Sequence, residues 1–342
     1  MAPGRLSRHR GRCQHERRPR GLSGDKRLSV TPVVVALGGN ALIRDQTHLS
    51  IPDQYEAVCA IAPELVDLSE AGHPLVVTHG NGPQVGFILR RSEMSISEVA
   101  PVPLDYAVGD TQGAIGHMFL LALRNELRKR GSRRSVAAVV TQALVDTSDP
   151  AFDNPTKFVG AVLDEATARA RAATLGWTVA EDPPLGWRRT VVSPEPKAIL
   201  ELDTIRCLLA EGVIVVACGG GGIAVAANDR GALVGVEAVI DKDLASALLA
   251  DELGAGLLVI PTAVDRVAIG YGTPDQRWLD RLTVDEARAW RDAGQFGVGS
   301  MRPKIDAIIG FVTGGADRVG IITSAARLSD AIAGAAGTRI VG

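Results

Sequence analysis

Short β-rich apolar segments alternate with helical stretches along most of the chain, and this alternation constrains the fold more than any other feature of the sequence. The apolar segments are VVVAL at 33–37, LVVT at 75–78, VAAVVT at 136–141, VIVVA at 213–217, LLVI at 257–260, VGIIT at 319–323 and TRIV at 338–341. Helices are expected at about 53–71, from Pro83, at 108–130, 199–211 and 241–252, from Thr283 and after Pro303. Such alternation predicts an α/β fold in which helices cover a parallel sheet.

Size and composition are those of a globular enzyme. The 342 residues, 46% hydrophobic and 22% charged, can form one large α/β domain or two smaller ones. No apolar run reaches the roughly 18 residues that a membrane span needs, and the N-terminus lacks the apolar core of a secretory signal. The four cysteines have no C-x-x-C spacing, which disfavours a zinc site or a disulfide. We therefore expect a cytoplasmic enzyme with no membrane partner.

Charge is distributed unevenly along the chain. Residues 1–30 contain nine Lys and Arg against Glu16 and Asp25, a net charge of +7, so the rest carries −9 of the chain's total of −2. The first 30 residues have almost no apolar content and are predicted to be a disordered basic extension, followed by a folded domain at 31–342. The acidic body argues against nucleic acid as the main ligand.

The regular alternation is interrupted between about residues 142 and 198. This stretch is rich in Pro, Asp, Trp and Gly and contains one short helical segment, DEATARARAATLG. An insertion of this length inside an α/β pattern is usually a lid or a subdomain. The sequence therefore predicts a protruding lid here.

Glycine clusters follow three of the predicted strands. They are Gly38-Gly39-Asn40, the segment HGNG at 79–82 and the GGGG run at 219–222. In open α/β sheets ligands bind at the carboxyl ends of strands, where glycine lets backbone N–H groups approach an anion. Gly38-Gly39-Asn40 has the spacing of neither a phosphate loop nor a dinucleotide fingerprint. GNGPQVG resembles a dinucleotide fingerprint in part, but it is not in the first turn and no acidic residue follows at the position that a dehydrogenase needs. The clusters predict an anion-rich ligand that is not a dinucleotide.

Three lysines stand beside predicted turns in a chain whose basic residues are mostly arginine. They are Lys157 in the insertion, Lys242 in VIDKDLASALLA and Lys304 in GSMRPKIDAII. Lysine acts as a point charge on phosphates, so the three predict phosphoryl transfer. Asp241 and Asp243 flank Lys242 and would orient the lysines or reach Mg²⁺ through water, although an aspartate at a helix start also serves as a cap. His79 at a strand end is more typical of a hydrogen-bonded structural group than of a catalytic base.

Longer blocks carry a family resemblance. The blocks VVALGGNAL, VVTHGNGPQVG, GDTQGAIGHM, VVTQALVDTSDPAFDNPTKFVG, ACGGGGIAV, EAVIDKDLASALLA, TAVDRV and GQFGVGSMRPKIDAII closely resemble the carbamate kinases of the amino acid kinase superfamily, from about residue 32 to the C-terminus. The resemblance implies a three-layer αβα sandwich with a largely parallel central sheet that works as a homodimer. It also implies an N-terminal lobe at about 31–212 that binds carbamate and carries the lid, and a C-terminal lobe at about 213–342 that binds Mg-ATP.

The resemblance also implies roles for individual residues. Lys157, Lys242, Lys304, Asp243 and Asn40 would be catalytic, with Asp243 aligning the lysines and Lys157 supplying a charge that related kinases place in the first strand. The substrate site would consist of Gly38, Gly39, Asn40, His79, Gly80, Asn81 and Gly82. The nucleotide site would consist of Gly219, Gly220, Gly221, Gly222, Asp241, Lys242, Thr262, Ala263, Val264, Asp265, Met301 and Lys304. The resemblance implies Mg²⁺ held through the phosphates, with Asp243 reaching it only through water and no direct protein ligand.

Four positions depart from the family pattern. Phe158 and Ala224 stand where proline is usual, Val192 stands where VPSP is common, and Gly270 replaces an asparagine near the adenine pocket. None is a proposed lysine or aspartate. These departures bear on nucleotide affinity and lid geometry more than on the chemistry.

The residues and the resemblance together predict a reversible reaction of ADP and carbamoyl phosphate to ATP and carbamate, by direct in-line transfer. Carbamate is already an oxyanion, so no general base is needed. Two alternatives are another acyl-phosphate-forming amino acid kinase of the same fold and a non-catalytic nucleotide-binding sensor. A narrow glycine-lined HGNG segment disfavours the first, and the intact lysines and Asp243 disfavour the second.

Overall fold

A computed structural model describes residues 30–39, 42–43 and 47–342. The predicted basic extension and Asn40 lie outside the described residues, apart from Val30. The centre of the fold is an eight-stranded sheet in the order β15-β17-β16-β12-β1-β2-β9-β3. Its strands are β1 (Val33–Leu37), β2 (Leu75–His79), β3 (Val136–Ala138), β9 (Ile214–Val216), β12 (Leu257–Thr262), β15 (Arg281–Thr283), β16 (Val319–Ser324) and β17 (Thr338–Val341). Neighbouring strands run parallel except for the antiparallel pair β16–β17.

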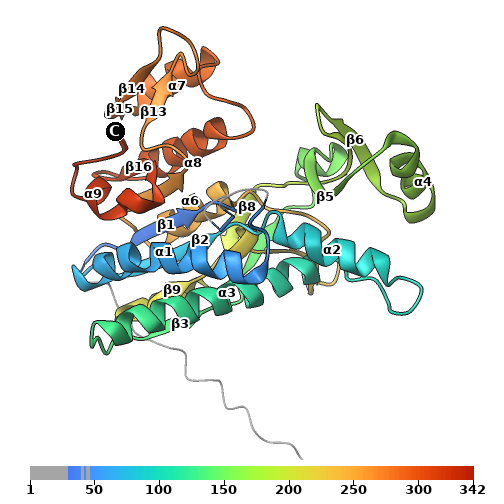
Figure 1. The fold of residues 1–342 in the computed structure, drawn as a ribbon, viewed down its shortest axis with the longest axis horizontal. Helices are drawn as coiled ribbons and strands as arrows, with labels where there is room; N and C mark the ends of the chain where they lie inside the picture. Colours follow the sequence, from blue (N-terminus) through green and yellow to red (C-terminus); the bar gives the residue numbers. More distant parts are fainter. Residues whose placement is uncertain (1–29, 40–41, 44–46) are drawn as a thin grey trace, which may run out of the picture.

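Helices cover both faces of this sheet, which confirms the predicted three-layer sandwich (Figure 1). One face packs against α1 (Ile51–Glu70), α3 (Leu104–Lys129) and α9 (Leu328–Ile332), and the other against α5 (Leu202–Ala210), α6 (Lys242–Glu252), α7 (Val284–Asp292) and α8 (Met301–Thr313). Side chains of β1 alternate between the faces, because Val33, Val35 and Leu37 join one cluster while Val34 and Ala36 join the other. A strand buried on both faces must be apolar at every position, as VVVAL is.

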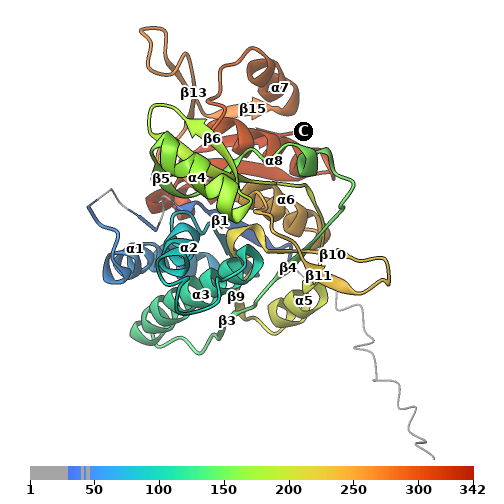
Figure 2. The ribbon, with the colours of Figure 1, turned by 90° about the vertical axis from the view of Figure 1, so that its right-hand side faces the viewer.

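The lid occupies only the middle of the predicted insertion. Strands β5 (Lys157–Leu163), β6 (Thr178–Asp182) and β7 (Gly186–Val191) form a three-stranded sheet that carries α4 (Glu165–Leu175). Figure 1 shows this unit projecting from the main body, and Figure 2 shows it from the side, in front of the core. At its base, β5 packs on α2 (Gln84–Met94).

The two ends of the predicted insertion belong to a second sheet instead. Strands β4 (Gln142–Val145) and β8 (Pro196–Ile199) pair with each other, and β4 also pairs with β10 (Ile223–Ala227), beyond which lies β11 (Leu233–Gly235). Ala143, Val145 and Ile199 are buried in the same core cluster as α6. Burial of these apolar side chains ties both ends of the insertion to the main body.

Several element boundaries differ from the sequence prediction for local reasons. Helix α3 begins at Leu104, four residues before the predicted start, with Pro103 at its N-cap. Helix α8 begins at Met301 and contains Pro303 in its first turn, where the missing N–H breaks no helical hydrogen bond. The hairpin of β13 (Val267–Ile269) and β14 (Arg277–Leu279) was not predicted. Among the described residues, no helix combines the length and apolarity needed to cross a membrane.

Candidate active site

The turns that follow β1, β2 and β9 lie at one edge of the sheet because these strands are parallel neighbours. The first two turns touch through backbone. A Cβ atom on Gly39 would lie 2.2 Å from the Gly82 carbonyl oxygen, and one on Gly80 would lie 2.8 Å from the Gly39 nitrogen. Glycine at these positions therefore allows the two turns to pack together, and the Gly80 N–H is used within this packing because it donates to the Leu37 carbonyl at 2.9 Å.

The GGGG run packs against the second of these turns. A Cβ on Gly219 would lie 2.5 Å from His79 Cε1, and one on Gly220 would lie 2.3 Å from Asn81 Nδ2. All four glycines are buried. The structure thus places Gly219–Gly222 beside the HGNG segment.

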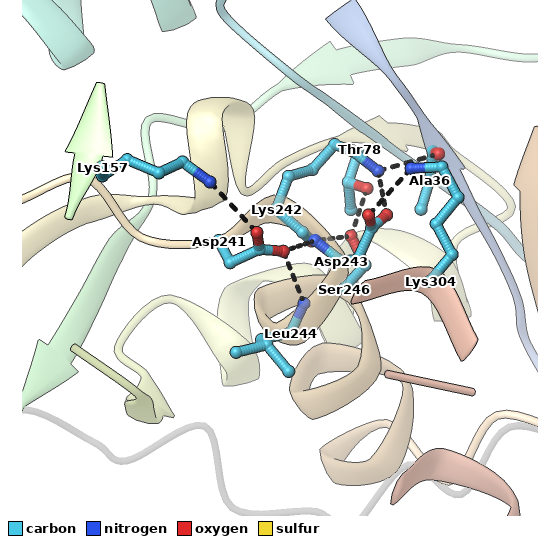
Figure 3. A network of polar contacts seen from close by, with 9 residues as sticks. All are labelled: Ala36, Thr78, Lys157, Asp241, Lys242, Asp243, Leu244, Ser246 and Lys304. Atoms are coloured by element: carbon cyan, nitrogen blue, oxygen red, sulfur yellow. Dashed lines mark hydrogen bonds and ion pairs between the residues drawn. The ribbon is translucent and has the colours of Figure 1, made fainter. Parts of the chain in front are cut away.

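Asp243 lies at the centre of a cluster of charges at the start of α6 (Figure 3). One of its carboxylate oxygens pairs with Lys242 and the other accepts from Lys304 Nζ at 3.0 Å. Lys242 Nζ also donates to the Ala36 carbonyl of β1 at 3.1 Å. The ammonium groups of α6 and α8 are therefore held against the carboxyl end of β1, where the Gly38-Gly39 turn begins.

Burial makes this cluster electrostatically strong. The Asp243 side chain is only 6% exposed, and those of Lys242 and Lys304 are 11% and 16% exposed. Burial tends to raise the pKa of the Asp243 carboxyl, but the two ammonium groups outweigh it and hold that pKa below its usual range. Burial lowers the pKa of Lys242 against the opposing charge of Asp243. Asp243 thus stays ionised and keeps two lysines together that would otherwise repel each other.

The lid contributes the third lysine. Lys157, the first residue of β5, reaches back from the lid so that its Nζ lies 3.1 Å from Asp241 Oδ2 (Figure 3). Asp241 is the N-cap of α6 and Asp243 lies in its first turn, so the capping role foreseen for the pair belongs to Asp241. Three lysines and two aspartates leave one surplus positive charge beside the glycine turns, as a site for phosphate requires.

His79 and Asn81 are buried between the glycine turns and α3. The His79 side chain stacks on Phe119, its Nδ1 lies 2.9 Å from the Gly80 carbonyl oxygen, and burial lowers its pKa to about 4. Asn81 Nδ2 donates to Thr111 Oγ1 at 3.2 Å. A neutral, enclosed imidazole with these partners orders the turn. Of the backbone groups in this segment, those of Gly80 are buried and bonded, because its N–H donates to the Leu37 carbonyl at 2.9 Å, whereas Gly82 is exposed. The exposed Gly82 backbone, rather than the His79 ring, is therefore the accessible part of the predicted substrate segment.

The residues predicted for the nucleotide lie in two places. Thr262 ends β12 and Ala263 to Asp265 follow it, and all four are at least partly exposed. Met301 opens α8 and packs on the core cluster that α8 shares with β12. The GGGG run follows β9, and β1 and β2 separate these two strands in the sheet. Three strand spacings correspond to about 14 Å. Both groups adjoin the start of α6, because a Cβ on Gly221 would lie 2.6 Å from the Ile240 carbonyl oxygen and Lys304 of α8 pairs with Asp243. That they form one nucleotide site stays a prediction.

Some supporting groups escaped the sequence analysis. Thr78 and Ser246 share a hydrogen bond of 2.6 Å beneath the lysines, and Ser246 Oγ also bonds the Lys242 carbonyl. Gln112 joins the GGGG run to Thr141 through its buried amide. Ser246 stands four residues after Lys242, which is a detectable helical spacing. The Ala36 carbonyl has no signal in the side-chain pattern.

The departure at Gly270 has a backbone explanation. Its φ is +62°, in the left-handed region that glycine and asparagine both adopt with little strain. Glycine can therefore replace the usual asparagine without altering this turn. Val192 forms a β-bridge with Ala238 and Phe158 lies under the Arg188 guanidinium, so both departures fall at the base of the lid.

Comparison with known proteins shows the family to which the chain is similar. The sequence model of the amino acid kinase family matches residues 31–323. The chain is 46% identical to the carbamate kinase of Thermococcus kodakarensis over 90% of its own length and 98% of that relative's. It is likewise 46% identical to carbamate kinase 1 of Enterococcus faecium, over 85% and 93% of the two chains. Among solved structures, carbamate kinase from Giardia lamblia bound to AMP-PNP superposes with a TM-score of 0.86 at 38% identity, covering 92% of this chain and 99% of that one.

Proposed function

The chain belongs to the amino acid kinase family and, within it, to the carbamate kinases, and we propose that it transfers a phosphoryl group between carbamoyl phosphate and ADP through the Asp243-centred lysine cluster. The observation that carries this assignment of roles is the buried Asp243, which holds Lys242 and Lys304 at the end of β1. A cluster of this kind is suited to neutralise a phosphoryl group in transfer.

The residues present account for the reaction without a proton transfer. In the direction of ATP formation, a β-phosphate oxygen of ADP attacks phosphorus, and the bond from phosphorus to the carbamoyl oxygen breaks. Its electron pair leaves with carbamate, which after release takes up a proton from water and decomposes to ammonia and carbon dioxide. The lysine ammonium groups would contact the equatorial oxygens of the transferred phosphoryl group and its bridging oxygen. The backbone of Gly38-Gly39 and of Gly80–Gly82 would hold the carbamoyl group. The low pKa of His79, about 4, agrees with a mechanism that needs no imidazole acid or base.

Magnesium fits this site as a partner of the phosphates. Among the described residues, no three His, Cys, Asp or Glu side chains gather in a way that could hold a metal ion. Both oxygens of Asp243 are engaged by lysines, so Asp243 would reach Mg²⁺ only through water. Phosphate oxygens and water are the usual surroundings of Mg²⁺ in kinases, where the ion neutralises phosphate charge. We further propose that the enzyme works in the cytoplasm as a homodimer and consumes carbamoyl phosphate in arginine catabolism.

The test is formation of ATP from carbamoyl phosphate and ADP by the wild type and by Asp243→Asn. We expect the wild type to be active and the variant to lose about 10²-fold or more in kcat, because the lysines lose the charge that aligns them. The matched control is Asp306→Asn. Asp306 also lies on α8 but pairs with Arg291 of α7, so this variant should retain wild-type turnover. ATP formation by Asp243→Asn at the wild-type rate would remove Asp243 from the mechanism. A wild type that forms no ATP would favour the sensor or the amino acid kinase instead.

A further inference from the structure

The segment 237–241, which leads into α6, binds the base of the lid at three points. Arg189 of β7 pairs with Glu237, with its Nη2 3.1 Å from Oε2. The Val239 N–H donates to the Val192 carbonyl at 3.1 Å, and Lys157 Nζ lies 3.1 Å from Asp241 Oδ2. Lys157 is also the cross-strand partner of Val191. Both ends of the lid sheet thus contact the short segment that leads into α6.

Asp241 divides its two carboxylate oxygens between two tasks. Oδ1 accepts from the backbone N–H groups of Asp243 at 2.8 Å and Leu244 at 3.4 Å, which caps α6. Oδ2 is left for Lys157 (Figure 3). Helix capping accounts for the first oxygen only. The second links the position of the lid lysine to the start of the helix that carries Lys242 and Asp243.

We propose that Asp241 is a positioning residue whose Oδ2 holds Lys157, and with it the lid, over the lysine cluster before substrate binds. The expected effect on the rate of ATP formation rests on the proposed function. Lysine has a flexible stem and three donors, so Lys157 can turn from Asp241 to the phosphoryl group without the lid leaving its place. Asp241 thereby holds the charge of Lys157 at the start of α6 before the phosphoryl group arrives.

The expected effect of losing this contact is moderate. The side chains of Lys157 and Asp241 are 40% and 23% exposed, so water screens their attraction. If substrate binds only when the lid is held in this position, the apparent affinity for substrate falls in proportion to the fraction of molecules in which it is so held. Removing the pair should therefore reduce kcat/KM for carbamoyl phosphate by about two- to tenfold, much less than removal of Lys157 itself.

The experiment combines hydrogen exchange with a double-mutant cycle on the full-length protein. Asp241→Asn keeps an oxygen for capping but loses the charge that binds Lys157, so α6 should persist and the melting temperature should stay near wild type. In the ligand-free state, lid residues 157–191 should exchange faster in Asp241→Asn and, to a similar extent, in Lys157→Met. The control Asp164→Asn alters an aspartate N-cap that lies in the lid without a lysine partner, and should leave lid exchange and turnover unchanged.

Kinetics of ATP formation complete the cycle. Asp241→Asn should lower kcat/KM in the wild-type background and have no further effect in the Lys157→Met background, because both changes remove one contact. Equal loss in both backgrounds, or lid exchange unchanged in both single variants, would overturn the proposal. If Asp241→Asn does not fold, exchange in Lys157→Met still decides it. Absence of ATP formation by the wild type would refute the proposed function, while the exchange data would still test the Asp241 contact.

Discussion

At the scale of single residues, His79 links burial to a pH dependence of stability. Its pKa is lowered to about 4 in the folded protein by burial, whereas an exposed histidine has a pKa near 6.5. Between these values the unfolded chain binds the proton more readily, so stability should rise as pH increases from 4 to 6.5 and gain nothing from His79 above that range. Over this pH range, His79 should change the free energy of unfolding by roughly 3 kcal/mol.

Urea unfolding at several pH values between 4.5 and 7.5 measures this contribution. His79→Gln should be less stable than wild type at neutral pH, because the ring packs on Phe119, but its stability should vary less with pH below 6.5. The control His73→Gln changes a histidine that is only partly buried, before β2, and should keep the wild-type slope. A His79→Gln slope equal to that of the wild type would mean that His79 is not the group responsible.

At the scale of elements, the contact between the turns after β1 and β2 leaves no room for a methyl group. Gly39→Ala would place Cβ 2.2 Å from the Gly82 carbonyl oxygen, so one backbone must move. We expect both a lower melting temperature and a loss of ATP formation, since this backbone lines the site. Gly310→Ala is the matched control, because Gly310 is exposed in α8 and a Cβ there would meet no heavy atom within 4 Å beyond the neighbouring backbone of the helix, so alanine should stabilise the helix by up to about 1 kcal/mol. The melting temperature should therefore fall in Gly39→Ala and rise slightly in Gly310→Ala. The rate of ATP formation should fall in Gly39→Ala alone.

The elements also show which parts of the fold local sequence can predict. Strands such as β1 and β12 are continuous apolar runs because both faces are buried, and Asp241 and Thr283 signal helix starts through their caps. Strand β4 was assigned to the insertion because its partner β10 lies some 80 residues further on, and local patterns contain no information on such pairing. The lysines of the site were found by their setting in turns. Whether Asp241 or Asp243 caps α6 depends on where the helix begins. Both residues are suited to an N-cap, so the sequence alone does not fix that start.

At the scale of the whole molecule, one edge of the central sheet is open in the single chain. Strand β3 ends the sheet, and α3 beside it exposes small and apolar residues including Gly113, Ala114 and Leu121. Val140, just after β3, is 58% exposed, and a cavity of about 140 Å³ lies between α3 and this edge, lined in part by His117 and Leu120. An apolar edge of this kind supports the proposed homodimer, in which a second copy would cover it.

Light scattering after size exclusion tests this assembly. The wild type should have twice the 35.8 kDa mass of one chain, whereas Leu121→Asp, which places a charge on the α3 face, should shift it towards a single chain. Leu185→Asp is the matched control, since Leu185 is 61% exposed in the lid between β6 and β7 and should leave the dimer intact. Lys157, Lys242, Lys304 and Asp243 meet within one chain, so the Leu121→Asp monomer should still form ATP while melting at a lower temperature. A wild type of 35.8 kDa at micromolar concentration, or a Leu121→Asp protein that stays dimeric, would show that α3 and β3 do not form the contact between subunits.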